Sequence, residues 1–196
     1  TPDSFSDGGD FDTIEDALAQ VERMISQGAS IIDVGGESTR PGAEFVTEEE
    51  EIARIVPVIQ AIKEKYDVLI SIDTYKTATA RAALEAGADI LNDVWAGLYD
   101  GQMLALSAEK NVPIILMHNQ KEEKYNDVTE NVCTFLSQRT QAALEAGVAK
   151  ENIWIDPGFG FAKNVQHNID LLRGLVNVVG LGYPVLFGIS RKRVVD

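Results

Sequence analysis

The chain has 196 residues, of which 45% are hydrophobic and 24% charged, a balance typical of a folded globular protein and not of a disordered acidic tail. Its 17 Lys and Arg residues against 31 Asp and Glu residues give a formal net charge of −14, which argues against a protein that binds nucleic acid through a basic face. The lack of a signal-peptide pattern and of a long apolar run, together with a single cysteine, Cys133, predicts a soluble cytoplasmic protein without membrane contact.

Six short runs rich in β-branched residues recur along the chain, and each has Gly, Asn, Asp, Ser or His among its last two residues. Their nearly continuous apolar content is typical of parallel strands that are covered on both faces. Segments with helical periodicity precede and separate these runs. In chain order, the pattern predicts helix 13–27, strand 29–35, helix 47–66, strand 68–74, helix 76–86, strand 88–94, helix 101–110, strand 112–118, helix 126–146, strand 152–158, helix 165–179 and strand 184–190.

The ends of the predicted helices carry their own signals. Thr13 and Asp16 resemble a capping box at the start of the first helix, with Asp in place of Glu. Gly87 and Gly147 each follow a helix and lead toward the next strand, which predicts a left-handed residue at both positions. The sequence therefore predicts a repeating βα unit.

A repeated βα unit with parallel strands leaves two architectures, an open doubly wound sheet or a closed (β/α)8 TIM barrel, and spacing alone does not choose between them. A barrel of this kind needs about 250 residues and eight strands. For a barrel, we expect the first and last strands to be missing from this chain, which starts on Thr1 instead of Met and ends just after a basic cluster. Because no linker or low-complexity tract interrupts the chain, we expect a single domain, truncated at both ends, over residues 1–196.

Polar side chains collect where the predicted strands end. They are Asp33 and Thr39 after the first strand, Asp73 after the second, Asn92 and Asp93 after the third, His118 and Asn119 after the fourth, Asp156 after the fifth, and Ser190, Arg191 and Lys192 after the sixth. In parallel α/β folds the active site lies at the carboxyl ends of the strands. Any one of these groups could be a structural cap, but their recurrence after six strands indicates an active site.

Most short catalytic motifs are absent from the sequence. The run from Gly158 to Lys163 begins like a dinucleotide fingerprint, but Lys163 stands where the third glycine belongs. No Walker P-loop, HExxH or GxSxG motif is present. With only two histidines, His118 and His167, a three-histidine metal site is impossible, although carboxylates with asparagine could hold a hard cation such as magnesium.

Two glycine-rich loops, residues 1–9 and 35–42, are typical of mobile lids. Arg40 in the second loop would position an anionic group through a charge-assisted hydrogen bond. The alternative is a plain turn with a surface arginine. In the first loop, the aromatic Phe5 stands where a flexible loop would otherwise be polar.

Six sequence blocks, taken in order, resemble the dihydropteroate synthase family. They are TPDSFSDGG (1–9), DVGGESTRPG (33–42), SIDTYK (71–76), ILNDV (90–94), DPGFGFAK (156–163) and GISRKR (188–193). The resemblance extends over the whole chain and implies the TIM barrel instead of the open sheet. It also implies a transferase of folate biosynthesis, the target of sulfonamides, which joins 7,8-dihydropterin-6-ylmethyl diphosphate to 4-aminobenzoate and releases pyrophosphate.

The resemblance also implies roles for individual residues. The groups expected to hydrogen-bond the pterin edge are Asp73, Asn92, Asp156 and Lys192, and the catalytic residues among them are Asp73, Asp156 and Lys192. Met117 and Phe161 would form apolar walls and Gly188 would allow close approach to the ring, although each could also be plain core. The residues expected to order over the diphosphate and to form the aminobenzoate pocket with Lys192 are Phe5, Thr39, Arg40, Pro41 and Ser190.

The resemblance implies Mg2+ as cofactor, but the family's asparagine ligand lies before Thr1 and an Arg-x-His pair of its anion site lies after Asp196. We therefore expect no metal ligand in this chain, and we expect the isolated polypeptide to be inactive or unstable. Members of this family are usually homodimers, so the resemblance also implies a homodimer. Two alternatives stay open: a pterin-fold methyltetrahydrofolate methyltransferase, which has no use for the two lids, and a non-catalytic pterin-binding domain, which would release no pyrophosphate.

Overall fold

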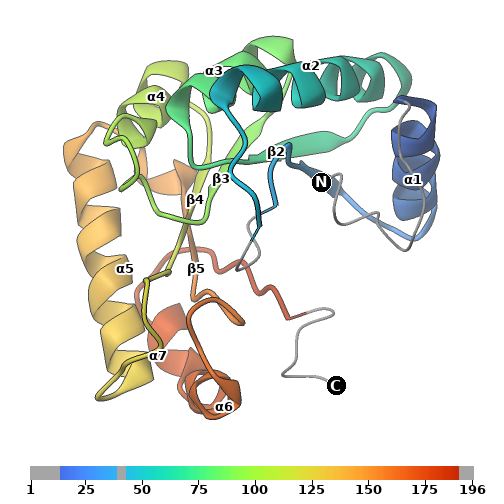
Figure 1. Ribbon diagram of the computed structural model, residues 1–196. Helices are drawn as coiled ribbons and strands as arrows, with labels where there is room; N and C mark the ends of the chain where they lie inside the picture. Colours follow the sequence, from blue (N-terminus) through green and yellow to red (C-terminus); the bar gives the residue numbers. More distant parts are fainter. Residues whose placement is uncertain (1–13, 39–42, 190–196) are drawn as a thin grey trace. The chain divides into compact units, whose positions relative to one another are not determined.

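The computed structural model describes residues 14–38 and 43–189, in which helices and strands alternate as predicted (Figure 1). The elements are α1 (Ile14–Ser26), β1 (Ile31–Val34), α2 (Glu48–Lys65), β2 (Leu69–Asp73), α3 (Thr77–Ala86), β3 (Ile90–Asp93), α4 (Met103–Lys110), β4 (Ile114–Met117), α5 (Val128–Glu145), a 3-10 turn (Lys150–Asn152), β5 (Ile153–Asp156), α6 (Val165–Arg173) and α7 (Leu175–Val179). In this part of the chain, no helix is both long enough and apolar enough to cross a membrane. The chain divides into two compact units, Thr1–Asn92 and Asp93–Asp196.

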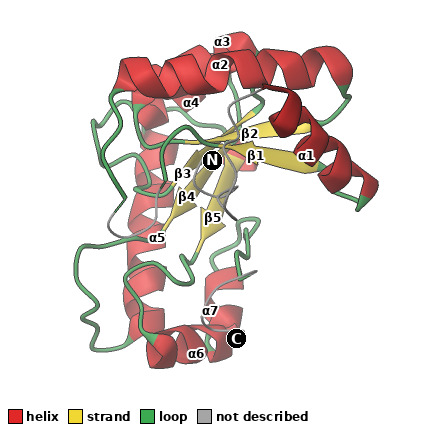
Figure 2. Cartoon of the chain, turned by 45° about the vertical axis from the view of Figure 1, so that its right-hand side comes forward, coloured by secondary structure: helices red, strands yellow, loops and turns green. Residues whose placement is uncertain are grey.

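In the first unit, β1, β2 and β3 pair in parallel, with Ile32 opposite Ile70 and Ile72 opposite Leu91. Helices α2 and α3 pack side by side, as both views show (Figure 1, Figure 2). The isoleucines of β2 are fully buried because helices and neighbouring strands leave them no solvent-facing side. The strands predicted from continuous apolar runs are thus confirmed here.

Helix α2 shows how the sequence builds the covering layer. Thr47 caps its amino end by accepting a hydrogen bond from the backbone N–H of Glu50 at 3.3 Å. Four glutamates occupy its first turn and two lysines its last turn, which complements the helix dipole. Ile55, Ile59 and Ile62 recur at spacings of four and three residues, so that they share one face, and all three are at most 1% exposed.

In the second unit, β4 and β5 pair in parallel, with Ile114 opposite Ile153 and Met117 opposite Asp156. Asp127 caps α5 by accepting the backbone N–H of Glu130 at 2.9 Å. The buried members of the core here are Val128, Val132, Leu136, Ile155, Phe159, Leu171 and Val178. They come from α5, β5, the following loop, α6 and α7, so this core fixes the loop that follows β5.

Two boundaries differ from the predicted ones. The predicted strand 184–190 is reduced, within the described residues, to a single parallel bridge between Val185 and Ile155. Pro184 has no N–H to donate, and it contributes only its carbonyl, to the N–H of Ile155 at 3.0 Å. The predicted helix 165–179 is two helices that meet at Gly174, where an added Cβ would lie 2.4 Å from the Thr129 hydroxyl oxygen.

The predicted helix ends have mixed outcomes. Gly87 and Gly147 have φ of 118° and 92°, which confirms the left-handed residue predicted after each helix. The predicted capping box at the first helix involves Thr13, which lies outside the described residues.

Candidate active site

In the first unit, the strand ends bring a carboxylate and an amide together. Asp33 on β1 accepts a hydrogen bond from the Ser71 hydroxyl at 2.5 Å. The Asn92 side-chain amide donates to the two carboxylate oxygens of Asp33 at 3.3 and 3.4 Å. Asp73 stands opposite Asn92 in the register of β2 and β3, so three predicted polar residues lie at the carboxyl ends of adjacent strands.

Asp93, the neighbour of Asn92, has a different environment. Its side chain is fully buried, and its two oxygens accept the backbone N–H groups of Trp95 at 2.8 Å and Gly97 at 2.7 Å. Burial raises the pKa of Asp93 to about 6, against these hydrogen bonds, which lower it. Arg139 donates to the carbonyl of Ala96 at 2.8 Å, so Asp93 and Arg139 together shape the turn after β3.

In the second unit, the ends of β4 and β5 are joined by backbone and side-chain contacts. The His118 N–H donates to the Asp156 carbonyl at 2.9 Å. Asp156 is buried, and its Oδ1 accepts the N–H of Gly158 at 2.7 Å. Met117, opposite Asp156, is also buried. This geometry fixes the carboxylate of Asp156 at the point where the chain leaves the strand.

The loop after β5 passes very close to the end of β4. Gly158 has a φ of 73°, and a Cβ at this position would lie 2.0 Å from the carbonyl oxygen of His118. A glycine is therefore required, both for the left-handed conformation and for the close approach. The N–H of Gly160 donates to the Asn168 side chain at 2.9 Å, which ties the same loop to α6.

The buried side chain of Lys163 holds this loop together through hydrogen bonds. It is 5% exposed, and its ammonium group lies 2.9 Å from His118 Nδ1 while donating to the carbonyls of Gly158 and Phe161, both at 3.0 Å. Burial and the nearby charge of Lys163 lower the pKa of His118 from 6.5 to about 3. His118 is therefore neutral, with Nδ1 accepting from the ammonium group, and it is part of the loop's support.

The neutral state of His118 can be observed by NMR. Between pH 8 and pH 5, we expect the imidazole resonance that disappears in a His118→Gln variant to keep its chemical shift, because its pKa of about 3 lies well below that range. A resonance that titrates in this range would show that burial and the charge of Lys163 do not hold the ring in its neutral form.

The remaining predicted site residues divide into two groups. Phe161 lies half-buried in the loop after β5, and Gly188 lies half-buried after the Val185 bridge. The predicted residues that lie outside the described part of the chain are Phe5, Thr39, Arg40, Pro41, Ser190, Arg191 and Lys192. In residues 14–38 and 43–189, no three or more His, Cys, Asp or Glu side chains form a group that could hold a metal ion.

Sequence reasoning missed the structural importance of two buried lysines, Lys76 and Lys163. In the sequence, Lys163 stands out only because it breaks a dinucleotide fingerprint. The available signal was that each lysine ends a sequence block, SIDTYK or DPGFGFAK, that contains an aspartate at the end of a predicted strand. A charge at such a position needs partners, which a single sequence does not identify.

Comparison with known proteins places the chain among characterised sequences. The family model described as "Pterin binding enzyme" matches residues 1–196. The dihydropteroate synthase of Streptococcus pyogenes serotype M6 is 74% identical over 196 residues, which cover 100% of this chain and 74% of that protein.

Two solved structures are similar over nearly the whole chain. The dihydropteroate synthase of Clostridium difficile, solved in the presence of pteroic acid, has a TM-score of 0.93 at 45% identity and covers 99% of this chain and 74% of its own. The Xanthomonas albilineans dihydropteroate synthase with 4-aminobenzoic acid has a TM-score of 0.93 at 46% identity, with coverage of 99% and 71%. These similarities confirm the predicted TIM-barrel fold class over the open sheet. With the family model matching every residue and a relative at 74% identity, the chain belongs to the dihydropteroate synthase family of pterin-binding enzymes.

Proposed function

We propose that the protein joins 7,8-dihydropterin-6-ylmethyl diphosphate to 4-aminobenzoate, and that Asp73, Asn92 and Asp156 hydrogen-bond the pterin together with Lys192. The product is 7,8-dihydropteroate and the leaving group is pyrophosphate, so the protein is a transferase. The observation that carries this assignment of residues is the register of β2 and β3, which sets Asp73 opposite Asn92 at the carboxyl ends of the two strands. Family membership supports the reaction itself.

The residue types suit a pterin. A pterin edge presents hydrogen-bond donors and acceptors side by side, and carboxylates accept while an asparagine amide does both. Buried groups of this kind penalise analogues that leave them unpaired. Asp156 already has one oxygen oriented by the N–H of Gly158, so its carboxylate would meet the substrate in a fixed position.

The proposed reaction proceeds through a positive charge that develops on the pterin methylene carbon. As the C–O bond to the diphosphate breaks, the electron pair leaves with pyrophosphate and the pterin methylene carbon becomes cationic. The neutral amine of 4-aminobenzoate then forms the new C–N bond and loses a proton. Asp73 and Asp156 would stabilise the developing positive charge electrostatically instead of acting as strong bases.

The other predicted residues take supporting positions in this proposal. Met117 and Phe161 would form the apolar walls beside the ring, and Gly188 would permit close approach. Two loops and the residue after the last described segment would supply the aminobenzoate and diphosphate contacts, through Phe5, Thr39, Arg40, Pro41 and Ser190. We include Mg2+ as the cofactor at the diphosphate, with no ligand assigned in this chain.

The wider organisation is also part of the proposal. We propose that residues 1–196 belong to one pterin-binding domain and that the protein acts as a cytoplasmic homodimer. The single cysteine, Cys133, which forms no disulfide, supports a reducing compartment. Light scattering of the purified full-length protein would measure the dimer.

The test is release of pyrophosphate by the full-length protein with pterin diphosphate, 4-aminobenzoate and Mg2+. We expect release that depends on 4-aminobenzoate and that falls at least about 30-fold in Asp73→Asn, since one charge near the cationic carbon is lost. Asp67→Asn is the matched control, because Asp67 is exposed and lies just before the opposite end of β2. It should leave the rate unchanged.

Two outcomes would contradict the proposal. A folded protein that binds pterin without releasing pyrophosphate would be a methyltransferase or a non-catalytic binding domain. Equal rates for Asp73→Asn and Asp67→Asn would remove Asp73 from the site.

A further inference from the structure

One buried ammonium group, that of Lys163, binds the loop after β5 at two of its carbonyls. An ammonium group has three N–H donors. The described acceptors around this one are His118 Nδ1 at 2.9 Å and the carbonyls of Gly158 and Phe161, both at 3.0 Å. A single nitrogen atom therefore holds both ends of residues 158–161.

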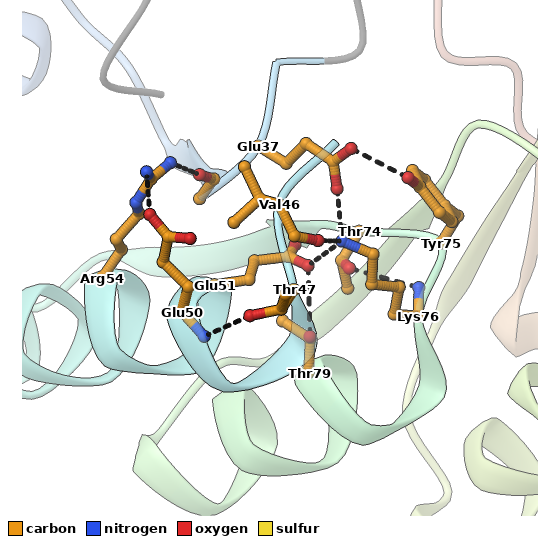
Figure 3. Close-up of polar contacts among 11 residues, drawn as sticks. Glu37, Val46, Thr47, Glu50, Glu51, Arg54, Thr74, Tyr75, Lys76 and Thr79 are labelled. Carbon is orange, nitrogen blue, oxygen red and sulfur yellow. Dashed lines mark hydrogen bonds and ion pairs between the residues drawn. The ribbon is translucent and has the colours of Figure 1, made fainter. Parts of the chain in front are cut away.

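The other buried lysine, Lys76, has a different kind of environment (Figure 3). It donates to the carboxylates of Glu37 and Glu51, so its charge is paired with opposite charges. The described hydrogen-bond partners of Lys163 are instead two backbone carbonyls and the imidazole of His118, which burial keeps neutral. Replacing Lys163 therefore leaves none of these partners as a buried charge.

Neighbouring side chains hold the same loop at further points. The Tyr125 hydroxyl donates to the carbonyl of Ala162 at 2.8 Å. The Asn168 side chain accepts the N–H of Gly160 at 2.9 Å and donates to the carbonyl of Lys163 at 3.2 Å. Ala162 has a φ of 46°, a left-handed conformation that is strained in a residue with a side chain. Such a conformation persists only where the surrounding contacts fix it, and it is typical of functional sites.

The loop also carries the hydrogen bond that orients Asp156. Asp156 Oδ1 accepts the N–H of Gly158 at 2.7 Å, and the carbonyl of Gly158 accepts from Lys163 at 3.0 Å. Because the N–H and the carbonyl belong to one residue, the ammonium group fixes the peptide on one side of Gly158 and the carboxylate contacts the peptide on the other. The position of the carboxylate thus depends on Lys163.

We infer that Lys163 is a positioning residue, which fixes the peptide groups of Gly158 and thereby holds the Asp156 carboxylate where it stabilises the positive charge on the pterin methylene carbon. This rests on the proposed function, in which Asp156 has that electrostatic role. Lys163 acts through Asp156 and not on the substrate. Because the charge develops only in the transition state, the effect of Lys163 is on kcat.

The first test is a Lys163→Met variant of the full-length protein, since methionine is also long and unbranched but donates no hydrogen bond. We expect kcat for pyrophosphate release to fall at least about tenfold, because a small displacement of a group near the reacting atoms is costly. The KM for 4-aminobenzoate should change less than about threefold, because the lost interaction belongs to the transition state. An unchanged kcat in the folded variant would overturn the inference.

A double-mutant cycle with Asp156→Asn tests whether Lys163 acts through Asp156. In the Asp156→Asn background the carboxylate charge is already lost, so Lys163→Met should lower kcat by less than about a further threefold. A lysine that only stabilised the fold would lower kcat by the same factor in both backgrounds. That additive result would overturn the inference.

Ile114→Ala is the matched control for stability. Ile114 is fully buried at the amino end of β4, whereas His118 follows the carboxyl end of that strand. The substitution should destabilise the protein by leaving a cavity. Measured well below the unfolding temperature, its kcat should stay within about twofold of the wild type, because the cavity is far along the strand from the loop. A fall in kcat equal to that of Lys163→Met would assign the effect to stability.

If Lys163→Met does not fold, Tyr125→Phe is a milder change in the same loop. It removes the hydroxyl that donates to the Ala162 carbonyl and keeps the aromatic ring. We expect kcat to fall at least about threefold, and this fall to disappear in the Asp156→Asn background. Full kcat in Tyr125→Phe would show that the loop contacts do not set the place of Asp156.

Hydrogen exchange separates this inference from the proposed function, because it needs no turnover. In Lys163→Met, the N–H of Gly158 should exchange at least about tenfold faster relative to the N–H of Ile155 on β5. The Ile155 N–H donates to the carbonyl of Pro184 at 3.0 Å and serves as the internal reference. If the wild type releases no pyrophosphate, the proposed function fails, and exchange alone decides whether Lys163 fixes Gly158. An unaltered ratio would refute the positioning.

Discussion

Replacing Gly158 by alanine is expected to destabilise the protein by more than about 4 kcal/mol and to abolish pyrophosphate release, a loss that few single substitutions reach. The new Cβ would lie 2.0 Å from the carbonyl oxygen of His118 and 3.3 Å from the Lys163 ammonium nitrogen. Because the nearest atom belongs to the backbone at the end of β4, neither side can yield without moving a strand. Urea unfolding of the purified variant measures the effect.

A second glycine separates the two causes of this loss. Gly101 has a φ of 74°, almost equal to that of Gly158, but nothing lies within 4 Å of its would-be Cβ. Gly101→Ala therefore isolates the cost of the left-handed backbone, about 1–2 kcal/mol. If Gly158→Ala is no more harmful than Gly101→Ala, the approach to His118 is not a constraint.

Replacing Asp156 by asparagine is expected to lower the kcat of pyrophosphate release at least about 100-fold, because the carboxylate would stabilise a cationic carbon. The substitution keeps an oxygen that can accept the N–H of Gly158, so the turn after β5 should persist. We therefore expect the free energy of unfolding to change by less than about 1 kcal/mol. Steady-state kinetics and urea unfolding on one preparation measure both quantities.

Asp170→Asn provides the comparison for Asp156. Asp170 lies on α6, is partly exposed, and pairs with Arg173 at 3.3 Å. Its loss should leave kcat unchanged. If Asp156→Asn also retains full kcat with a stable fold, Asp156 serves only to shape the turn.

The sequence predicts the order of elements well because the relevant signals are local. Continuous runs of isoleucine and leucine identify buried parallel strands. Functional side chains were expected at the carboxyl ends of these strands, and two of the residues named there, Asp33 and Asn92, are hydrogen-bonded to each other. The prediction of a single helix over residues 165–179 was wrong at Gly174, where the close contact with Thr129 requires a residue without a side chain. That contact joins α5 to the end of α6, which no local pattern reveals.

The buried lysines mark a second limit of sequence reasoning. Lys76 contacts Glu37, 39 residues away, and Lys163 contacts His118, 45 residues away. Asp93 and Asn92 are adjacent, yet one supports a turn while the other meets Asp33. Composition and spacing identify these residues as polar groups at strand ends. Only the folded structure shows which of them stabilise a turn and which could contact a ligand.

The opposed environments of Asp93 and His118 have a consequence for how the second unit tolerates acid. His118 has a pKa of about 3 when folded and 6.5 when unfolded, so its contribution weakens the fold as pH falls below 6.5. Asp93 has a pKa of about 6 when folded and 3.8 when unfolded, so its protonation strengthens the fold as pH falls from 6 to 3.8. Over that interval the folded state gains one proton while the unfolded state gains another, and the two linkages oppose each other. Through this pair, mild acidification therefore changes the free energy of unfolding little, because the folded and unfolded states take up similar numbers of protons.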